Sequence, residues 1–189
     1  MTLKVFITGA SSGIGEALAV YYAAQGATLG LAARRADTLA GLSQRLGGGH
    51  ACYALDVTDA PALHAAAADF IGRFGAPDIV IANAGVSAGT LTEHEEDLAV
   101  FRRLMDINVF GMAATFAPFV PAMRAAGGAE GKMQRLVGIA SVAGIRGLPG
   151  AEAYSASKAA AIAYLESLRL EMRPYGIKVV TIAPGYIET

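Results

Sequence analysis

The sequence contains little cysteine and little charge. Cys52 is the only cysteine among 189 residues, so the chain cannot form an internal disulfide, which fits a reducing cytosol. Charged residues make up 16% of the chain, and the formal net charge is −1. Nucleic-acid partners require a basic surface, so this balance argues against one. The histidines, His50, His64 and His94, have no ligand spacing, and we predict no metal site.

Long uninterrupted apolar stretches are also missing. No window of about 18 residues is apolar without an interrupting Gly, Arg or Gln, as a membrane span would require. The first residues lack the apolar region and cleavage site of a signal peptide. We therefore expect a cytoplasmic protein without a membrane partner. With 54% hydrophobic residues, the chain is expected to form a single domain, 1–189, with a substantial core.

Short apolar runs alternate with helical patterns along the whole chain. The runs are rich in β-branched residues and lack polar alternation, which is typical of parallel strands buried on both faces. The expected strands are 3–8, 27–33, 51–57, 78–82, 135–140 and 177–183. The expected helices are 14–25, 37–46, 59–74, 98–126 (bent near Pro118 and Pro121) and 154–173, with a surface connection at 127–131. This order predicts an α/β, doubly wound parallel sheet with helices on both faces.

A glycine-rich stretch, "TGASSGIG", separates the first expected strand from the first helix. Gly9 permits a sharp turn, Gly13 lets the backbone approach a pyrophosphate, and Gly15 lets the helix pack closely against the sheet. The helix N-terminus would add free N–H groups and partial positive charge. A tight turn without a ligand is the alternative. The position after the first strand favours phosphate or dinucleotide binding.

The end of the second expected strand carries positive rather than negative charge. An acidic residue there would bind the ribose 2′-hydroxyl of NAD, but this chain has Ala33 followed by Arg34 and Arg35. A guanidinium suits a 2′-phosphate through its charge and its donor fork. The alternative is a solvated pair that opens the next helix. We favour NADP(H), with NAD(H) as the less favoured cofactor.

Several short motifs occur in one order along the chain. They are "TGASSGIG" (8–15), "NAG" (83–85), Asn108 in "MDINVFG", Ser141 in "IASVAG", Tyr154 and Lys158 in "YSASK", and "PG" (184–185). Each motif alone is weak, but the ordered set closely resembles the short-chain dehydrogenase/reductase (SDR) family, of the NADP-preferring type. The resemblance covers essentially the whole chain.

The resemblance implies a Rossmann-like, three-layer α/β/α fold, a cofactor site and a catalytic tetrad. The tetrad would be Asn108, Ser141, Tyr154 and Lys158. The implied cofactor-binding residues are Gly9, Ser11, Ser12, Gly13, Ile14, Gly15, Arg34, Arg35, Asp56, Val57, Asn83, Ala84, Gly85, Tyr154, Lys158, Pro184, Gly185, Ile187 and Thr189. Asp56 and Val57 would end the third strand and flank the adenine. Because Ser12 rather than a basic residue precedes Gly13, the NADP(H) prediction rests on Arg34 and Arg35.

The Tyr154–Lys158 pair could transfer protons. The two residues are four positions apart, so they share a helix face. A phenol with a pKa near 10 is a poor base, but an adjacent ammonium favours the phenolate. Ser141 would bind the substrate oxygen, and the resemblance implies a helix kink at Asn108 with a carbonyl-and-water relay to Lys158. Taken singly, each residue could instead be an ordinary helix, turn or surface residue.

The substrate side is the least determined part of the sequence. The resemblance leads us to expect several tens of further residues, forming a substrate lid and a last strand that this sequence does not contain. The candidate lining residues are small and mostly apolar, which suggests an uncharged carbonyl or alcohol; they are Ser87, Val142, Ala143, Leu148 and Pro149. The resemblance also implies a homodimer or homotetramer formed through 98–126 and 154–173. A catalytically idle NADP(H)-binding sensor or scaffold, and an isomerase or epimerase, remain open. Cys52 is expected in the core or the sheet.

Overall fold

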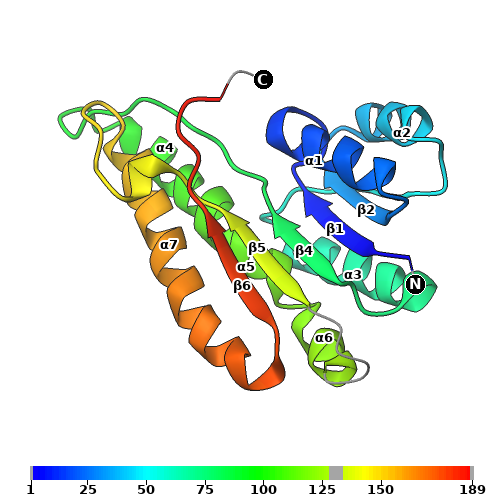
Figure 1. Cartoon of the computed structure of the whole chain (residues 1–189). Helices are drawn as coiled ribbons and strands as arrows, with labels where there is room; N and C mark the ends of the chain where they lie inside the picture. The colour runs from blue at the N-terminus through cyan, green and yellow to red at the C-terminus, as the bar shows by residue number, and fades with distance from the viewer. Residues whose placement is uncertain (1, 128–133, 188–189) are drawn as a thin grey trace.

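Six parallel strands form one sheet in the order β3-β2-β1-β4-β5-β6 (Figure 1). The computed structural model describes residues 2–127 and 134–187. The strands are β1 (Lys4–Thr8), β2 (Thr28–Ala33), β3 (Ala51–Ala54), β4 (Ile79–Ala82), β5 (Arg135–Ile139) and β6 (Lys178–Ile182). The order reverses between β1 and β4, which confirms the predicted doubly wound sheet and places a switch point where ligands bind in such folds.

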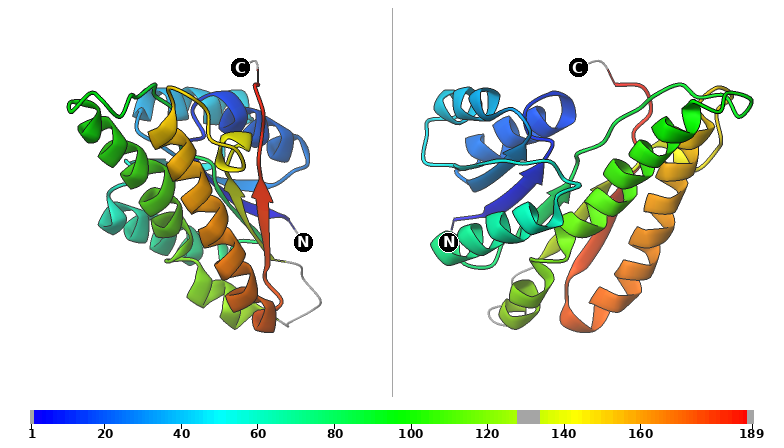
Figure 2. Two further views of the ribbon diagram at one scale, coloured as in Figure 1. Left: turned by 90° about the vertical axis from the view of Figure 1, so that its left-hand side faces the viewer. Right: turned by 180° about the vertical axis from the view of Figure 1, so that it is seen from behind.

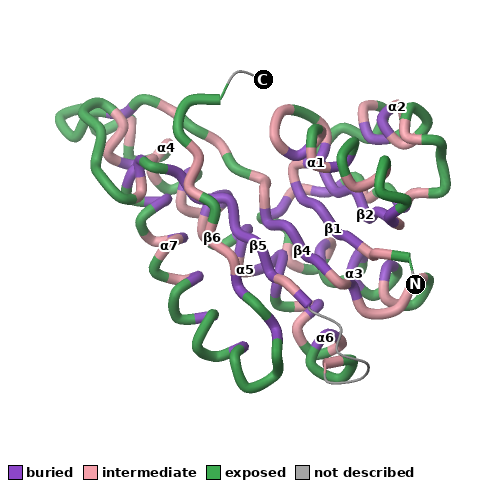
Figure 3. The backbone as a smooth tube through the Cα atoms, viewed as in Figure 1, coloured by how far each residue is buried: buried purple, intermediate pink, exposed green. Residues whose placement is uncertain are grey.

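Helices cover both faces of the sheet. They are α1 (Gly13–Ala24), α2 (Ala36–Arg45), α3 (Ala60–Phe74), α4 (Asp97–Met105), α5 (Gly111–Phe116), α6 (Val120–Ala126) and α7 (Glu152–Met172). Helices α1 and α2 pack on one face, and α3, α5 and α7 pack on the other (Figure 2). The central strands are therefore buried on both sides (Figure 3), which is the physical reason for their nearly continuous apolar sequences.

The stretch 97–126 is helical but not one regular helix. A π-helical turn, η1 (Asp106–Phe110), joins α4 to α5, and a break around Pro118 separates α5 from α6. Pro121 lies in the first turn of α6, where a missing N–H costs nothing. The predicted irregularities at Asn108 and at the prolines are thus present. This is the one described stretch long and apolar enough to cross a membrane, and half of its apolar window is buried inside the protein.

One expectation requires correction, one is met, and one lies largely outside the described residues. Strand β3 ends at Ala54, so Asp56 and Val57 follow the strand rather than end it. The reason is local: the Asp56 carboxylate accepts hydrogen bonds from the Thr58 N–H and hydroxyl, which turns the chain. Cys52 lies in the sheet, one of its two expected places, at an exposed position of β3. Of the predicted connection 127–131, residues 128–131 are not described.

Candidate active site

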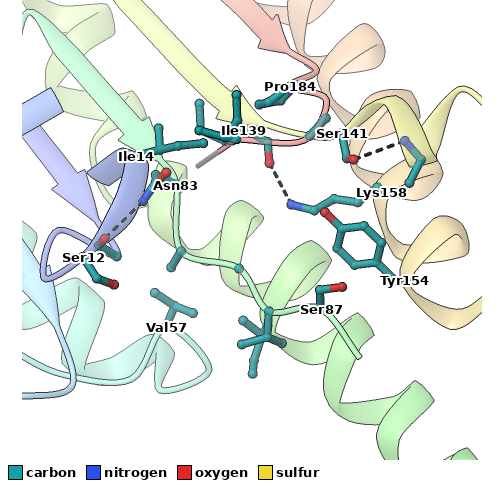
Figure 4. Close-up of a pocket in the computed structure, with 18 of the residues that line it drawn as sticks. Ser12, Ile14, Val57, Asn83, Ser87, Ile139, Ser141, Tyr154, Lys158 and Pro184 are labelled. Carbon is teal, nitrogen blue, oxygen red and sulfur yellow. Dashed lines mark hydrogen bonds between the residues drawn. The ribbon is translucent and has the colours of Figure 1, made fainter. Parts of the chain in front are cut away.

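The loops that follow the strands surround one pocket of about 810 Å³ (Figure 4). Each loop begins at the carboxyl end of its strand, and in a parallel sheet these ends share one edge. The pocket volume is within the range of small-molecule and cofactor sites. The parallel topology thus brings residues that are far apart in the sequence into one site.

The β1–α1 turn and the loop after β4 pack directly against each other. Gly9 has φ +67°, and a Cβ there would lie 2.8 Å from the Ala84 Cα. A Cβ on Gly15 would overlap the Gly9 carbonyl and approach the Asn83 Nδ2 to 2.5 Å. Asn83 Nδ2 donates to the carbonyls of Thr8 and Gly9, both at 3.1 Å. Glycine is therefore required at both positions, and Asn83 holds the turn in place.

Thr8 is a structural residue of this site that sequence reasoning missed. Its hydroxyl accepts hydrogen bonds from the backbone N–H groups of Asn83 (3.2 Å) and Ala84 (3.3 Å). It donates to the Ile81 carbonyl at 3.4 Å. The hydroxyl thereby connects the ends of β1 and β4 at the switch point. The sequence signal that could have identified Thr8 is a polar residue at the end of an apolar strand.

Positive charge lines the end of the pocket next to β2. Arg34 and Arg35 are both exposed and line the pocket beside Asp56. The hydrogen bond from the Thr58 backbone lowers the pKa of the Asp56 carboxyl, and the positive charge of Arg34 acts in the same direction. Within the described part of the chain, neither arginine makes a hydrogen bond or salt bridge, so their donors face solvent.

Tyr154, Lys158 and Ser141 meet at the other end of the pocket. Lys158 is only 5% exposed, and its Nζ donates to the Ile139 carbonyl at 2.9 Å. The same Nζ lies 5.8 Å from the centroid of the Tyr154 ring (Figure 4). Burial lowers the pKa of Lys158 to about 8. Ser141 Oγ accepts from the Ala143 N–H at 3.1 Å, which leaves the hydroxyl proton free to donate.

Two glycines allow the loop after β4 and the turn after β5 to approach Lys158 closely. A Cβ on Gly144, in the 3-10 turn η2 (Val142–Gly144) after Ser141, would lie 2.6 Å from the Lys158 carbonyl carbon. A Cβ on Gly85 would lie 3.2 Å from Asn108 Oδ1 and 3.3 Å from Lys158 Nζ. The loop after β4, the turn after β5 and α7 therefore converge on this lysine.

Asn108 lies behind the pocket rather than on its wall. It is buried within the π-helical turn, and its Oδ1 accepts from the Val86 N–H at 2.9 Å. Its Nδ2 donates to the Val86 carbonyl at 2.9 Å and to Ser157 Oγ at 3.0 Å. The amide thus fixes the loop after β4. A proton relay through its backbone carbonyl stays a prediction.

A family model described as short chain dehydrogenase matches residues 3–189 of the chain. The chain belongs to this family. Membership implies binding of a nicotinamide cofactor in an oxidoreductase fold, in agreement with the glycine turn at the switch point.

Proteins similar to this chain include animal and microbial members of the family. Dehydrogenase/reductase SDR family member 7B of Mus musculus is 39% identical over 193 residues, which cover 98% of this chain and 58% of the mouse protein. The crystal structure of a short-chain dehydrogenase from Streptomyces avermitilis has a TM-score of 0.91 at 35% identity, covering 100% of this chain and 68% of that one. An alcohol dehydrogenase from Thermococcus sibiricus, complexed with 5-hydroxy-NADP, has a TM-score of 0.87 at 29% identity, covering 100% and 78%. The chain spans little more than half the length of the curated relatives it matches, as with the 58% of the mouse protein.

Most of the residues predicted from the sequence of this short-chain dehydrogenase gather at one pocket. Those that line it are Gly9, Ser11, Ser12, Ile14, Arg34, Arg35, Asp56, Val57, Asn83, Ala84, Gly85, Ser141, Tyr154, Lys158, Pro184, Gly185 and Ile187. Gly13, Gly15 and Asn108 do not line the pocket: Gly13, with φ +57°, begins α1, Gly15 packs against the β1–α1 turn, and Asn108 holds the loop after β4. Thr189 lies outside the described residues. Their functional roles stay predictions.

The substrate-side expectations are met in part, and several wall residues were missed. Ser87, Val142, Ala143 and Leu148 line the pocket, whereas Pro149 does not. The lining residues not predicted are Ala33, Leu55, Val86, Ile107, Ile139, Ala140, Ala151 and Tyr186. Apart from Tyr186 these residues are small or aliphatic, so their sequence pattern cannot be distinguished from that of core residues.

Proposed function

We propose that residues 1–189 form a single catalytic domain of an NADP(H)-dependent oxidoreductase that interconverts a carbonyl and an alcohol. The observation that carries this proposal is that the buried Lys158 and Ser141 line one pocket with the half-buried Tyr154, and that this pocket begins at a glycine turn. The tetrad prediction from the sequence and this arrangement support the same chemistry.

The residues present fit a dinucleotide. The β1–α1 turn, which has no room for a Cβ at Gly9 or Gly15, leads into the start of α1, whose free N–H groups suit a pyrophosphate. Asp56 and Val57 would hold the adenine, and Asn83, Pro184 and Gly185 would support the nicotinamide half. When bound, the nicotinamide supplies or accepts the hydride.

The protein's own residues would hold the substrate oxygen and move one proton. Ser141 donates its free hydroxyl proton to the oxygen as negative charge develops there. Tyr154 gives its phenolic proton to that oxygen during reduction and takes it back during oxidation. The ammonium of Lys158 stabilises the phenolate that remains, because opposite charges in a partly desolvated site attract strongly.

The choice of NADP(H) rests on Arg34 and Arg35. Both arginines line the pocket at the end of β2 and make no hydrogen bond within residues 2–127 and 134–187, and a 2′-phosphate would accept from them. The similarity to the Thermococcus sibiricus enzyme, whose structure contains 5-hydroxy-NADP, supports the same cofactor.

The substrate side and the remaining surface suggest further properties. The wall beside Tyr154 is formed by Ser87, Val142, Ala143 and Leu148, and we propose an uncharged substrate. Leu98 (67% exposed), Phe110 (51%) and Leu170 (70%) leave apolar surface open on α4, η1 and α7. We propose that a second copy covers it in a homodimer or homotetramer, and that the protein is cytoplasmic without nucleic-acid or membrane partners.

The proposal is tested by an activity panel on the full-length protein. Ketones, aldehydes and alcohols are each assayed by nicotinamide absorbance with both cofactors. We expect NADPH oxidation with some uncharged carbonyls, NADP reduction with the matching alcohols, and lower activity with the NAD pair. Tight NADPH binding without turnover on any compound would instead identify an idle NADP(H)-binding protein.

Lys158 is expected to make the folded protein more stable as the pH rises above about 8. Burial lowers the pKa of Lys158 from 10.5 to about 8. Between these values the unfolded chain holds a proton that the folded chain has lost, so the free energy of unfolding increases with pH. The full gain is on the order of 3 kcal/mol. It is absent below about 8, where both states are protonated.

Urea unfolding of the wild type and of Lys158→Met, at several pH values in this window, measures the effect. The stability difference between the two proteins should grow with pH in favour of the wild type. Subtracting the variant removes the contribution of other groups that titrate in the same range. A difference that does not change with pH would show that the ammonium is not desolvated.

A further inference from the structure

A buried serine in α7 lies between the catalytic candidates without facing the pocket. Ser157 is 0% exposed, and it immediately precedes Lys158. Its hydroxyl donates to the Tyr154 carbonyl at 2.7 Å and accepts from Asn108 Nδ2 at 3.0 Å. One hydroxyl therefore joins the first turn of α7 to the π-helical turn η1, across 49 positions of sequence.

The hydroxyl gives the Asn108 amide a third partner that suits only one of its two orientations. A serine hydroxyl has one proton, and Ser157 gives it to the Tyr154 carbonyl. Toward Asn108 it can then act only as an acceptor, so the NH₂ group must face Ser157. The Val86 backbone requires the same orientation, because its N–H can only donate to the amide oxygen and its carbonyl can only accept from the second amide N–H, each at 2.9 Å.

The orientation of this amide matters because the loop it holds contacts Lys158. The position of a Gly85 Cβ lies 3.3 Å from Lys158 Nζ and 3.2 Å from Asn108 Oδ1. Val86 and Ser87, the next two residues, line the pocket. If the amide turned around, its oxygen would face the Val86 carbonyl and its NH₂ the Val86 N–H, and both contacts would be lost.

We propose that Ser157 is a positioning residue for the reaction of this short-chain dehydrogenase. Through Asn108 it holds the Gly85–Ser87 segment against Lys158, and through the Tyr154 carbonyl it fixes the turn that carries the phenol. The inference rests on the proposed oxidoreductase function. It predicts that loss of the hydroxyl impairs turnover more than cofactor binding.

The test compares Ser157→Ala with Thr115→Val in the full-length protein. Thr115 is a matched control because it is also 0% exposed, and its hydroxyl donates to the Gly111 carbonyl at the same 2.7 Å. Both variants should lose similar stability. We expect Ser157→Ala to lower kcat roughly 10- to 100-fold, the cost of slight misplacement, with NADPH Kd little changed. Thr115→Val should keep the wild-type kcat.

A double-mutant cycle and a conservative variant separate positioning from simple packing. If Ser157 acts through Asn108, Asn108→Ala combined with Ser157→Ala should cost less than the product of the two single losses. Ser157→Thr retains a hydroxyl and should recover turnover. If Ser157→Ala does not fold, Ser157→Cys keeps the volume with a weaker donor and acceptor and should show the same kcat loss. The proposal would be overturned if the kcat loss of the double mutant equalled the product of the two single losses, or if Ser157→Ala had the same kcat as Thr115→Val.

Hydrogen exchange tests the same contact without any substrate. The Val86 amide should exchange faster in Ser157→Ala than in Thr115→Val, because its acceptor on Asn108 is no longer fixed. Unchanged exchange at Val86 would show that Asn108 does not need the serine. This readout stays informative if the wild type reduces no carbonyl, a result that would reject the proposed function alone.

Discussion

Tyr154→Phe in the full-length protein is expected to bind NADPH like the wild type and to lose about 100- to 10,000-fold in kcat, the usual contribution of a general acid or base. The phenol is half-buried in the pocket wall, and Lys158 Nζ lies 5.8 Å from its ring centroid. Phenylalanine keeps the ring and removes only the proton that would be transferred. Binding should persist because the glycine turn and the arginines are unchanged.

The matched control is Tyr164→Phe, the same substitution on the same helix. Tyr164 does not line the pocket, and burial raises the pKa of its phenol to about 12. Steady-state kinetics and NADPH fluorescence titration of both variants separate turnover from binding. Near-normal kcat in Tyr154→Phe would reject the assignment of Tyr154 as acid and base, whereas equal losses in the two variants would point to damage to α7.

Arg34→Ala is expected to weaken NADPH binding by about 10- to 100-fold while leaving NADH binding nearly unchanged. Hydrogen bonds to a charged group contribute about 1.5–3 kcal/mol, and each 1.4 kcal/mol is about tenfold in Kd. Only the 2′-phosphate distinguishes the two cofactors, so the loss should appear as a change in their ratio. It should also diminish at high salt, because the arginine is exposed.

Arg73→Ala controls for the loss of one positive charge. Arg73 pairs with Asp69 on α3 and does not line the pocket. Its removal should leave the ratio of the two affinities at the wild-type value. If Arg34→Ala weakened the binding of NADH as much as that of NADPH, Arg34 would contribute to the overall electrostatic field of the site without recognising the 2′-phosphate. Arg35 would then be the next candidate to substitute.

Local sequence signals predicted the elements because each signal has a local cause. Apolar runs such as "VFIT" predicted strands since both faces of the sheet are covered. Asp59 accepts from the Ala62 N–H at 3.0 Å and begins α3 as an N-cap residue should. Prolines interrupted the helical stretch where expected. The end of β3 was missed because a single aspartate turn outweighed the apolar pattern.

The supporting contacts of the site could not be predicted in the same way. The Thr8 hydroxyl binds backbone groups 75 and 76 positions away, and Asn108 binds Val86 and Ser157 at separations of 22 and 49. No periodicity or motif encodes such distances. A polar residue at a strand end or inside a helix indicates only that some partner exists.

The sequence by itself therefore determined the order of strands and helices, the glycine turn and the Tyr154–Lys158 pair, since these depend on neighbours within one or two turns. Tertiary structure alone decided that Gly85, Gly144 and Ile139 meet at Lys158, that burial lowers the pKa of this lysine, and that Ser157 contacts Asn108. The physical reason is the parallel sheet, which brings together the carboxyl ends of strands that are far apart in the sequence. Only the packing around these strand ends excludes water from the Lys158 ammonium.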